Sequence, residues 1–164
     1  MMKIAYFAGG CFWCITPIFK LYDGVFEVVS GYSGGDEENP SYELVKSQKT
    51  LHRETVAVNY DENLISYKEL LNVFIGAVDV TDAGGQFIDR GRSYTLAVYY
   101  TDDSEKASAE EEIRKFEREN DLKCEISIEK FKSFYKAEEY HQDYYLKNPE
   151  EFEKELETSG RKER

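Results

Sequence analysis

The sequence predicts one domain of the α+β class, a two-layer sandwich in which helices pack on a mixed sheet. Three observations support this prediction. The 164 residues suffice to bury a core without disulfide or metal support. Strand and helix patterns alternate along the whole chain, and no internal repeat or low-complexity linker divides it. The front portion also follows the order of a split β-α-β plan.

Two strands and a helix are expected before the first long loop. Residues 3–8 form a short apolar run that ends at a glycine pair, which predicts a strand and a turn. Bulky apolar side chains over residues 11–21 predict a helix that stops at Gly24. β-Branched and aromatic residues over 25–32 predict a second strand, and the polar run GYSGGDEENPSY predicts the loop.

The middle of the chain predicts two helices around a strand. Residues 41–48 suit a short helix, and RETVAVNY alternates as a strand should. Ser66 and Glu69 form a capping-box pattern ahead of an apolar run, which predicts a helix over 67–78. Residues 79–93 combine three glycines with polar side chains, and a loop of that length commonly carries function.

The last part of the chain predicts additions at the C-terminal end of the fold. YTLAVYY suits a strand, 103–120 a charged helix and 124–130 another strand. Residues 137–146 predict the start of a C-terminal helix that Pro149 interrupts. A charged tail is expected over about 147–164, within a single domain 1–164.

The charge of the chain excludes a nucleic-acid partner. Lys and Arg number 21 against 33 Asp and Glu, for a net charge of -12, so the surface should repel phosphate backbones. The apolar stretch from Ile4 to Phe19 is too short to span a bilayer and contains two glycines, so we expect no membrane partner or signal peptide. We therefore expect a cytoplasmic protein, whose cysteines indicate catalysis or metal binding.

The stretch GCFWC carries the chemistry. Cys11 is expected at the first turn of a helix, where unpaired N–H groups and the helix dipole favour a thiolate. The glycines before it allow close approach of a substrate, and Phe12 and Trp13 offer flat apolar surface beside the sulfur. This combination suits a small apolar group bound against a reactive thiol.

Several interpretations of Cys14 stay open. Its α-carbon should lie roughly 5–6 Å from that of Cys11, which is within disulfide range, so Cys14 could trap an oxidised Cys11. Alternatively, Cys14 is an inert buried thiol. A zinc site would need Cys124, His52 and His141 to join the pair. The C-x-x-C pattern also fits a glutaredoxin- or thioredoxin-like thiol–disulfide oxidoreductase, but none of the three prolines is placed to introduce a central strand.

Six motifs in order along residues 4–146 resemble the A class of peptide methionine-S-sulfoxide reductases: GCFWC, GYSGG, NPSY, HRETV, DRGRSY and AEEYHQDYY. The resemblance implies an α+β sandwich related to the ferredoxin-like plan, in agreement with the element order. It implies a protein-repair enzyme that acts under oxidative stress. Such an enzyme reduces methionine-S-sulfoxide, free or in oxidised proteins, through a sulfenic acid on a redox-active cysteine.

The resemblance also implies residue roles. A buried, protonated glutamate would act as general acid, and two tyrosines would donate hydrogen bonds to the sulfoxide oxygen. The matching positions are Cys11 as nucleophile, Phe12 and Trp13 for the methyl pocket, Glu54 as catalytic glutamate, Tyr42 and Tyr94 as pocket tyrosines, Asp89 as loop aspartate, and Glu139, His141 and Tyr144 near the pocket.

The chain departs from the family's usual pattern at two places. Cys14 stands where Gly is common, and the tail EEFEKELETSGRKER lacks the usual resolving cysteines. We therefore expect Cys14 to resolve the sulfenic acid, with Cys124 or an external thiol as alternatives. No bound cofactor is expected, only a reductant such as thioredoxin, glutaredoxin or dithiothreitol. Ser93 and Thr95 stand where Gln and Arg are usual.

Overall fold

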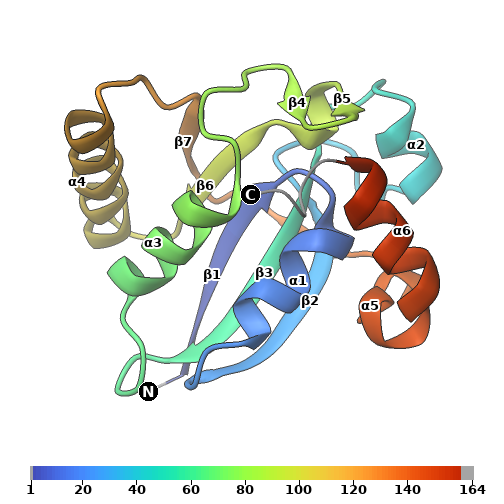
Figure 1. Ribbon diagram of the computed structural model, residues 1–164, viewed down its shortest axis with the longest axis horizontal. Coiled ribbons are helices and arrows are strands. Elements are labelled where there is room, and N and C mark those ends of the chain that lie inside the picture. Colours follow the sequence, from blue (N-terminus) through green and yellow to red (C-terminus); the bar gives the residue numbers. More distant parts are fainter. Residues whose placement is uncertain (1, 160–164) are drawn as a thin grey trace.

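The computed structural model describes residues 2–159 and consists of a twisted sheet with helices packed against it (Figure 1). The strands follow the spatial order β7-β6-β1-β3-β2-β8. Their bounds are Met2–Gly9 for β1, Val25–Ser33 for β2, Arg53–Asp61 for β3, Leu96–Tyr100 for β6, Ile126–Lys130 for β7 and Phe134–Lys136 for β8. The helices are α1 (Phe12–Lys20), α2 (Tyr42–Lys46), α3 (Tyr67–Ala77), α4 (Asp103–Asn120), α5 (Tyr144–Lys147) and α6 (Pro149–Ser159).

The sheet topology confirms the predicted fold class. Strand β3 lies between β1 and β2 and runs antiparallel to both, so β1, α1 and β2 form a split β-α-β unit. Strand β6 pairs antiparallel with the other edge of β1, which completes the four-stranded ferredoxin-like core. The additions are β7, parallel to β6, and β8, antiparallel to β2.

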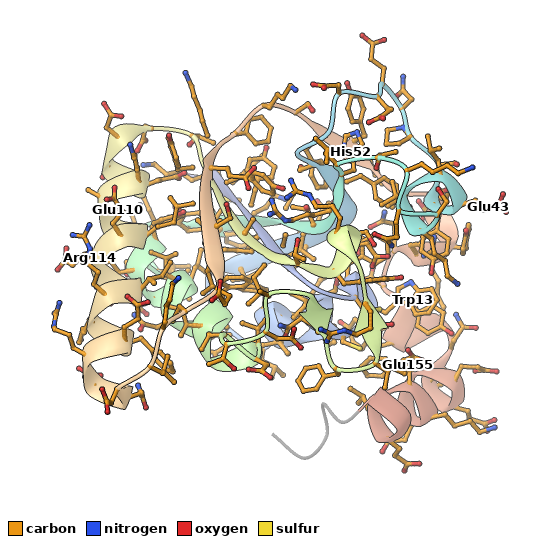
Figure 2. All side chains as sticks on the ribbon, turned by 90° about the horizontal axis from the view of Figure 1, so that it is seen from above. Trp13, Glu43, His52, Glu110, Arg114 and Glu155 are labelled. Carbon is orange, nitrogen blue, oxygen red and sulfur yellow. The ribbon has the colours of Figure 1, made fainter. Side chains whose placement is uncertain are left out.

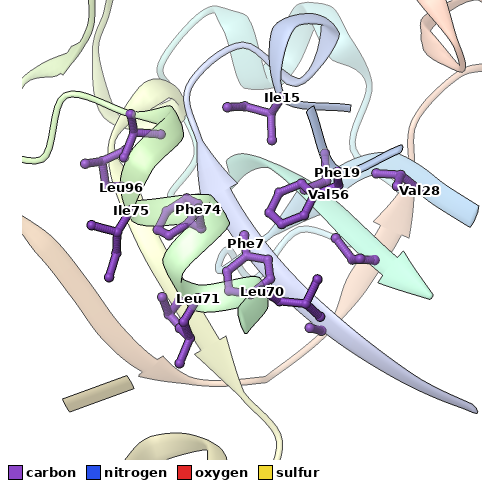
Figure 3. Packing of buried hydrophobic residues seen from close by; sticks show 14 of the residues in the cluster. Phe7, Ile15, Phe19, Val28, Val56, Leu70, Leu71, Phe74, Ile75 and Leu96 are labelled. Atoms are coloured by element: carbon purple, nitrogen blue, oxygen red, sulfur yellow. The ribbon is translucent and has the colours of Figure 1, made fainter. Parts of the chain in front are cut away.

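The core lies between the sheet and helices α1, α3 and α4. Alternation along β1 sends Ala5 and Phe7 to this face and Tyr6 to the opposite one. The Phe7 ring stacks on Phe19 of α1 at 5.3 Å between centroids and on Phe74 of α3 at 5.1 Å (Figure 3). Each pair adds about 0.5–1.5 kcal/mol beyond area burial. These contacts pack the last turn of α1 and the helix α3 against β1.

Two helices begin and end close to their predicted positions because local signals define them. Ser66 and Glu69 make both hydrogen bonds of the capping box at the start of α3. Asp102 accepts a hydrogen bond from the Glu105 N–H at the start of α4, at 2.8 Å, and Asp121 ends that helix in the left-handed conformation.

The segments around the functional loop differ from prediction. Tyr94 is not in a strand: it ends a short 3₁₀ turn, η1 (Arg92–Tyr94), and β6 begins at Leu96. The loop after α3 contains a small ribbon of β4 (Gly85–Gln86) and β5 (Asp89–Arg90). Gln86 holds the ribbon in place, since its amide bonds both the N–H and the carbonyl of Asp79 at 2.8 Å.

The C-terminal prediction is wrong in three respects. Residues 137–146 contain a 3₁₀ turn, η2 (Glu139–His141), and only the start of a short helix, α5. The edge strand β8 was not predicted, and β7 starts two residues later than expected. The predicted interruption at Pro149 is present: α5 ends at Lys147, and Pro149 begins α6, because the first turn of a helix needs no proline N–H. The expected charged tail is therefore helical as far as Ser159, and residues 160–164 lie outside the described residues.

The antiparallel pairing of β3 with β1 and β2 determines where the functional residues meet. The end of β1, the start of α1 and the start of β3 all lie at the same end of the central strands. Glu54, near the start of β3, is paired with Tyr32 of β2. Within residues 2–159, no helix is both long and apolar enough to cross a bilayer.

Candidate active site

Cys11 is the residue that caps the N-terminus of α1. Gly10 precedes it with φ +88, a left-handed turn that glycine adopts without strain. The Cys11 carbonyl accepts the Cys14 N–H at 3.1 Å, and the Cys11 side chain is 7% exposed. The turn thus places the thiol just beyond the C-terminal end of β1, near the surface.

Glu54 lies against the same helix N-terminus. Its side chain is buried, and Oε1 accepts a hydrogen bond from the Phe12 N–H at 3.1 Å. Burial raises the pKa of Glu54 to about 8, with the charge of Asp89 acting in the same direction and the Phe12 hydrogen bond opposing it. At pH 7 this carboxyl is therefore mostly protonated, as required of a general acid.

The structure corrects the expected ionisation of Cys11. A hydrogen bond between the Cys11 and Cys14 side chains, burial and the charge of Glu54 raise the pKa of the Cys11 thiol well above its usual value. The helix dipole does not lower the pKa of Cys11 here, because the Phe12 N–H at the first helical residue donates to Glu54 instead. Cys11 is therefore a neutral thiol in the ligand-free protein.

The two predicted pocket tyrosines meet beside this pair. The Tyr42 and Tyr94 hydroxyls lie close enough to interact through a hydrogen bond, although α2 and η1 are far apart in the sequence. Burial and the charge of Glu54 raise the pKa of both phenols. Asp89 belongs to the same group, because its charge raises the pKa values of Glu54, Cys11 and Tyr94. Both hydroxyls are thus protonated donors near the thiol.

Phe12 and Trp13 have different surroundings. Phe12 is buried and packs on Tyr32 and His141, so its ring belongs to the core. Trp13 is half-buried and lies beside the C-terminal helices, as Figure 2 shows. Its indole stacks on Tyr144 of α5 at 4.0 Å between centroids, with 8° between planes. Trp13 therefore provides the more accessible apolar wall.

His141 orients the indole of Trp13. The indole Nε1–H donates to His141 Nδ1 at 2.8 Å, which leaves Nε2 to carry the hydrogen of the neutral ring. Burial lowers the pKa of His141 to about 4, so the ring stays neutral across the physiological range.

Glu139 is not brought to the site. Its side chain is 78% exposed and forms ion pairs with Lys136 and Lys147. The neighbouring Glu138 faces inward instead and accepts hydrogen bonds from the Tyr32 hydroxyl at 2.8 Å and the Tyr42 N–H at 2.9 Å. Sequence reasoning missed Glu138 because a run of adjacent glutamates gives no indication of which one faces inward.

Gln142 is a second residue that the sequence analysis missed. It is buried, its Oε1 accepts the Ser30 N–H at 2.9 Å, and its Nε2 donates to the carbonyls of Ser30 and Ala137 at 3.0 Å. These bonds attach the segment before α5 to β2. They explain how His141, distant in sequence, reaches Trp13. The only available signal was the position of Gln142 inside the AEEYHQDYY motif.

The three cysteines are reduced and buried, and two of them are neighbours. Cys14 contacts Cys11 directly. Cys124 precedes β7, which β6 separates from β1, so at the usual strand spacing it lies roughly 10 Å or more from the end of β1. Among the described residues, no group of three His, Cys, Asp or Glu side chains is arranged to hold a metal ion. His52 instead accepts the Gly35 N–H at Nδ1.

A thiol, a protonated carboxyl and two phenol donors converge at one end of the central strands of a ferredoxin-like sheet. This set of groups defines a thiol-dependent oxidoreductase. Comparison with known proteins supports this class. The sequence profile of the peptide methionine sulfoxide reductase family matches residues 3–164. A peptide methionine sulfoxide reductase MsrA of Bacillus velezensis is 45% identical over 97% of this chain and 91% of its own. The MsrA 2 of Staphylococcus aureus is 42% identical over 98% and 92%.

Solved structures agree with the sequence comparisons. Reduced Mxr1 from Saccharomyces cerevisiae superposes with a TM-score of 0.86 at 29% identity, over 91% of this chain and 87% of its own. Methionine sulfoxide reductase A of Corynebacterium diphtheriae gives 0.81 at 27% identity, over 90% and 76%. The chain belongs to the peptide methionine sulfoxide reductase family, in its A class. It is an enzyme that reduces methionine sulfoxide to methionine.

Proposed function

We propose that Cys11 takes the oxygen of methionine-S-sulfoxide while Glu54 supplies the proton. The Cys11 sulfur attacks the sulfoxide sulfur and forms a transient S–S bond. That bond then breaks as the oxygen passes to Cys11, so the S–O bond to methionine is replaced by an S–O bond to Cys11. The substrate sulfur is reduced by two electrons and Cys11 is oxidised by two, to a sulfenic acid. The Glu54 proton goes to the oxygen and the thiol proton of Cys11 replaces it, so no proton is consumed overall.

The hydrogen bond from Phe12 N–H to Glu54 carries this proposal. This hydrogen bond occupies Oε1 of Glu54, which leaves Oε2 to hold the acidic proton beside the Cys11 thiol. A carboxyl with a pKa of about 8 is roughly 90% protonated at pH 7, and it is a better proton donor than water at that pH. The charge of Asp89 assists by raising that pKa.

Tyr42 and Tyr94 would stabilise the oxygen as its bond to methionine breaks. When the two hydroxyls bond to each other, one of them donates and the hydrogen of the other is available for the substrate. Donors aimed at a developing charge lower the barrier because they need no reorganisation during the reaction. Trp13, oriented by His141, would receive the methyl group, and a site with separate places for methyl and oxygen distinguishes the two sulfoxide epimers.

Cys14 would then resolve the sulfenic acid. Its thiol condenses with the Cys11 sulfenic acid, which forms a Cys11–Cys14 disulfide and releases water. Cys14 also lines a surface groove of about 760 Å³, whose apolar walls include Ile18, Val73 and Phe152. Cys14 is buried at the bottom of this groove, so a dithiol would reach its sulfur from the groove after the walls move apart.

The reductant in this scheme is an external dithiol, thioredoxin or glutaredoxin in the cytoplasm and dithiothreitol in the test tube. Mxr1 of Saccharomyces cerevisiae has been solved in complex with Trx2, which favours thioredoxin. The reducing cytoplasm suits three cysteines that are free and buried. The substrate is methionine-S-sulfoxide, either free or exposed in oxidised proteins.

The test uses separate S and R epimers of a methionine sulfoxide peptide with dithiothreitol. Turnover of the S epimer alone, lost in Cys11→Ser, is expected. Turnover that survives in Cys11→Ser would refute the nucleophile. Reduction of insulin disulfides without any sulfoxide turnover would favour a general thiol–disulfide oxidoreductase instead.

A further inference from the structure

The Tyr42 and Tyr94 hydroxyls reach the site from two separate segments. Tyr42 is the first residue of α2, and Tyr94 is the last residue of η1. Neither segment is longer than five residues, so neither is rigid by itself. Some contact between the two segments must therefore hold one hydroxyl against the other.

Gln48 makes that contact. Its Oε1 accepts the Ser93 N–H at 3.0 Å, and its Nε2 donates to Ser93 Oγ at 2.8 Å. The same Nε2 donates to the Lys46 carbonyl at the end of α2, at 3.0 Å. Ser93 is buried and directly precedes Tyr94. One side-chain amide thus joins the end of α2 to the residue before Tyr94.

The backbone around this contact is adapted to it. Gln48 has φ +66, a left-handed conformation that a long side chain adopts only where surrounding contacts stabilise it. A Cβ at Gly91 would lie 2.6 Å from the Gln48 side chain, so only glycine leaves room for the amide there. Ser93 stands where the usual pattern of the family carries Gln. In this protein the side-chain amide at that place comes from Gln48, which bonds Ser93.

The residue after Tyr94 is anchored as well. The Arg53 Nε–H donates to Thr95 Oγ1 at 2.8 Å, and the Thr95 hydroxyl donates to the Arg92 carbonyl at 2.7 Å. Tyr94 is therefore held on both sides, by Gln48 through Ser93 and by Arg53 through Thr95. Of these two, only Gln48 also bonds the segment that carries Tyr42.

We propose that Gln48 is a positioning residue for the reductase reaction: its side-chain amide holds Ser93 so that the Tyr94 hydroxyl stays beside that of Tyr42. This inference rests on the proposed role of the two tyrosines. Loss of the amide should lower kcat more than it raises KM, because the hydrogen bonds to the oxygen strengthen as the transition state forms.

The test is a double-mutant cycle of Gln48 with Tyr94, with kcat and KM measured for the S epimer and dithiothreitol. Gln48→Gly removes the amide and suits the positive φ, and Gln48→Asn keeps an amide that is too short to reach Ser93. Each should lower kcat about tenfold in the wild-type background. Neither should lower it further in the Tyr94→Phe background. The exposed neighbour Lys49→Ala is the matched control and should leave kcat unchanged.

Three outcomes would overturn this assignment or its basis. Equal losses from Gln48→Gly in both backgrounds would mean a general structural role. An unchanged kcat in Gln48→Gly, while Tyr94→Phe is impaired, would refute the positioning role and leave the proposed function intact. Full activity of Tyr94→Phe would refute the tyrosine role itself and the positioning role with it. Alkylation of Cys11 at wild-type rate in each variant would show that the nucleophile end of the site is folded.

Discussion

The backbone N–H of Phe12 donates to Oε1 of Glu54 at 3.1 Å, which joins the start of α1 to the start of β3. A helix N-terminus ordinarily offers its free N–H groups to an anion, and the cysteine that caps this helix would be the obvious recipient. Here the donor binds a buried carboxyl instead. The site therefore holds a neutral acid next to a neutral thiol, and its response to pH follows from that pairing.

Glu54→Gln should reduce kcat by about 10²–10⁴-fold at pH 7, because the amide has no proton to transfer to the oxygen. In the wild-type enzyme, single-turnover rates should fall above pH 8 as Glu54 loses its proton, given its pKa of about 8. Rates measured from pH 6 to 10 for both proteins check this. A fall above pH 8 that persists unchanged in Glu54→Gln would assign the titration to another group.

The same carboxyl should make stability depend on pH. The pKa of Glu54 is raised from 4.5 to about 8, so folding binds a proton between these values and the stabilisation present below pH 4.5 is lost as pH rises through 8. Glu54→Gln has no such proton. The difference between the melting temperature of Glu54→Gln and that of the wild type should therefore become more positive as the pH rises from 4.5 to 8. A difference that stays constant would contradict this prediction.

Cys14→Ser should separate the first step from recycling. One equivalent of methionine should form at nearly the wild-type rate, and Cys11 should then accumulate as a sulfenic acid that dimedone traps. Thioredoxin-supported turnover should fall strongly. Cys124→Ser is the matched control and should retain it, since Cys124 lies across β6 from the site. Mass spectrometry of the oxidised protein provides the measurement, and an unbridged Cys14 in wild type would contradict the scheme.

His141→Leu should raise KM several-fold, because the Trp13 indole loses its acceptor at Nδ1. His141→Gln offers a carbonyl acceptor in its place and should remain close to wild type. Trp13 is the only tryptophan of the chain, so tryptophan fluorescence reports on the surroundings of this one indole. Identical emission spectra and KM values for the two variants would show that the hydrogen bond does not orient the indole.

Glu138 and Glu139 form a matched pair for a stability test. Glu138→Gln should lower the free energy of unfolding by about 1–2 kcal/mol, since one amide oxygen replaces two acceptors for Tyr32 and Tyr42. Glu139→Gln should change it by less than about 0.5 kcal/mol, because that side chain is 78% exposed. Urea unfolding of both variants measures the difference, and equal effects would refute the assignment.

Local signals in the sequence predicted most elements well. The capping box of Ser66 and Glu69 depends on neighbours a few residues away, so it can be read along the chain. The run RETVAVNY likewise indicates the strand β3 from local residue types. The C-terminal segment was mispredicted because its conformation depends on distant contacts. Gln142 holds it to β2 at Ser30, and no local pattern contains that information.

The sequence by itself determined the order of the main strands and helices as far as β7, the position of Cys11 at the start of a helix and the set of groups available for catalysis. The tertiary structure decided their ionisation and their partners. Antiparallel pairing buries Glu54 beside the Phe12 N–H, which raises the pKa of Glu54 to about 8 and withdraws a donor from Cys11. Burial and long-range hydrogen bonds set a pKa, and these depend on which distant segments pack together.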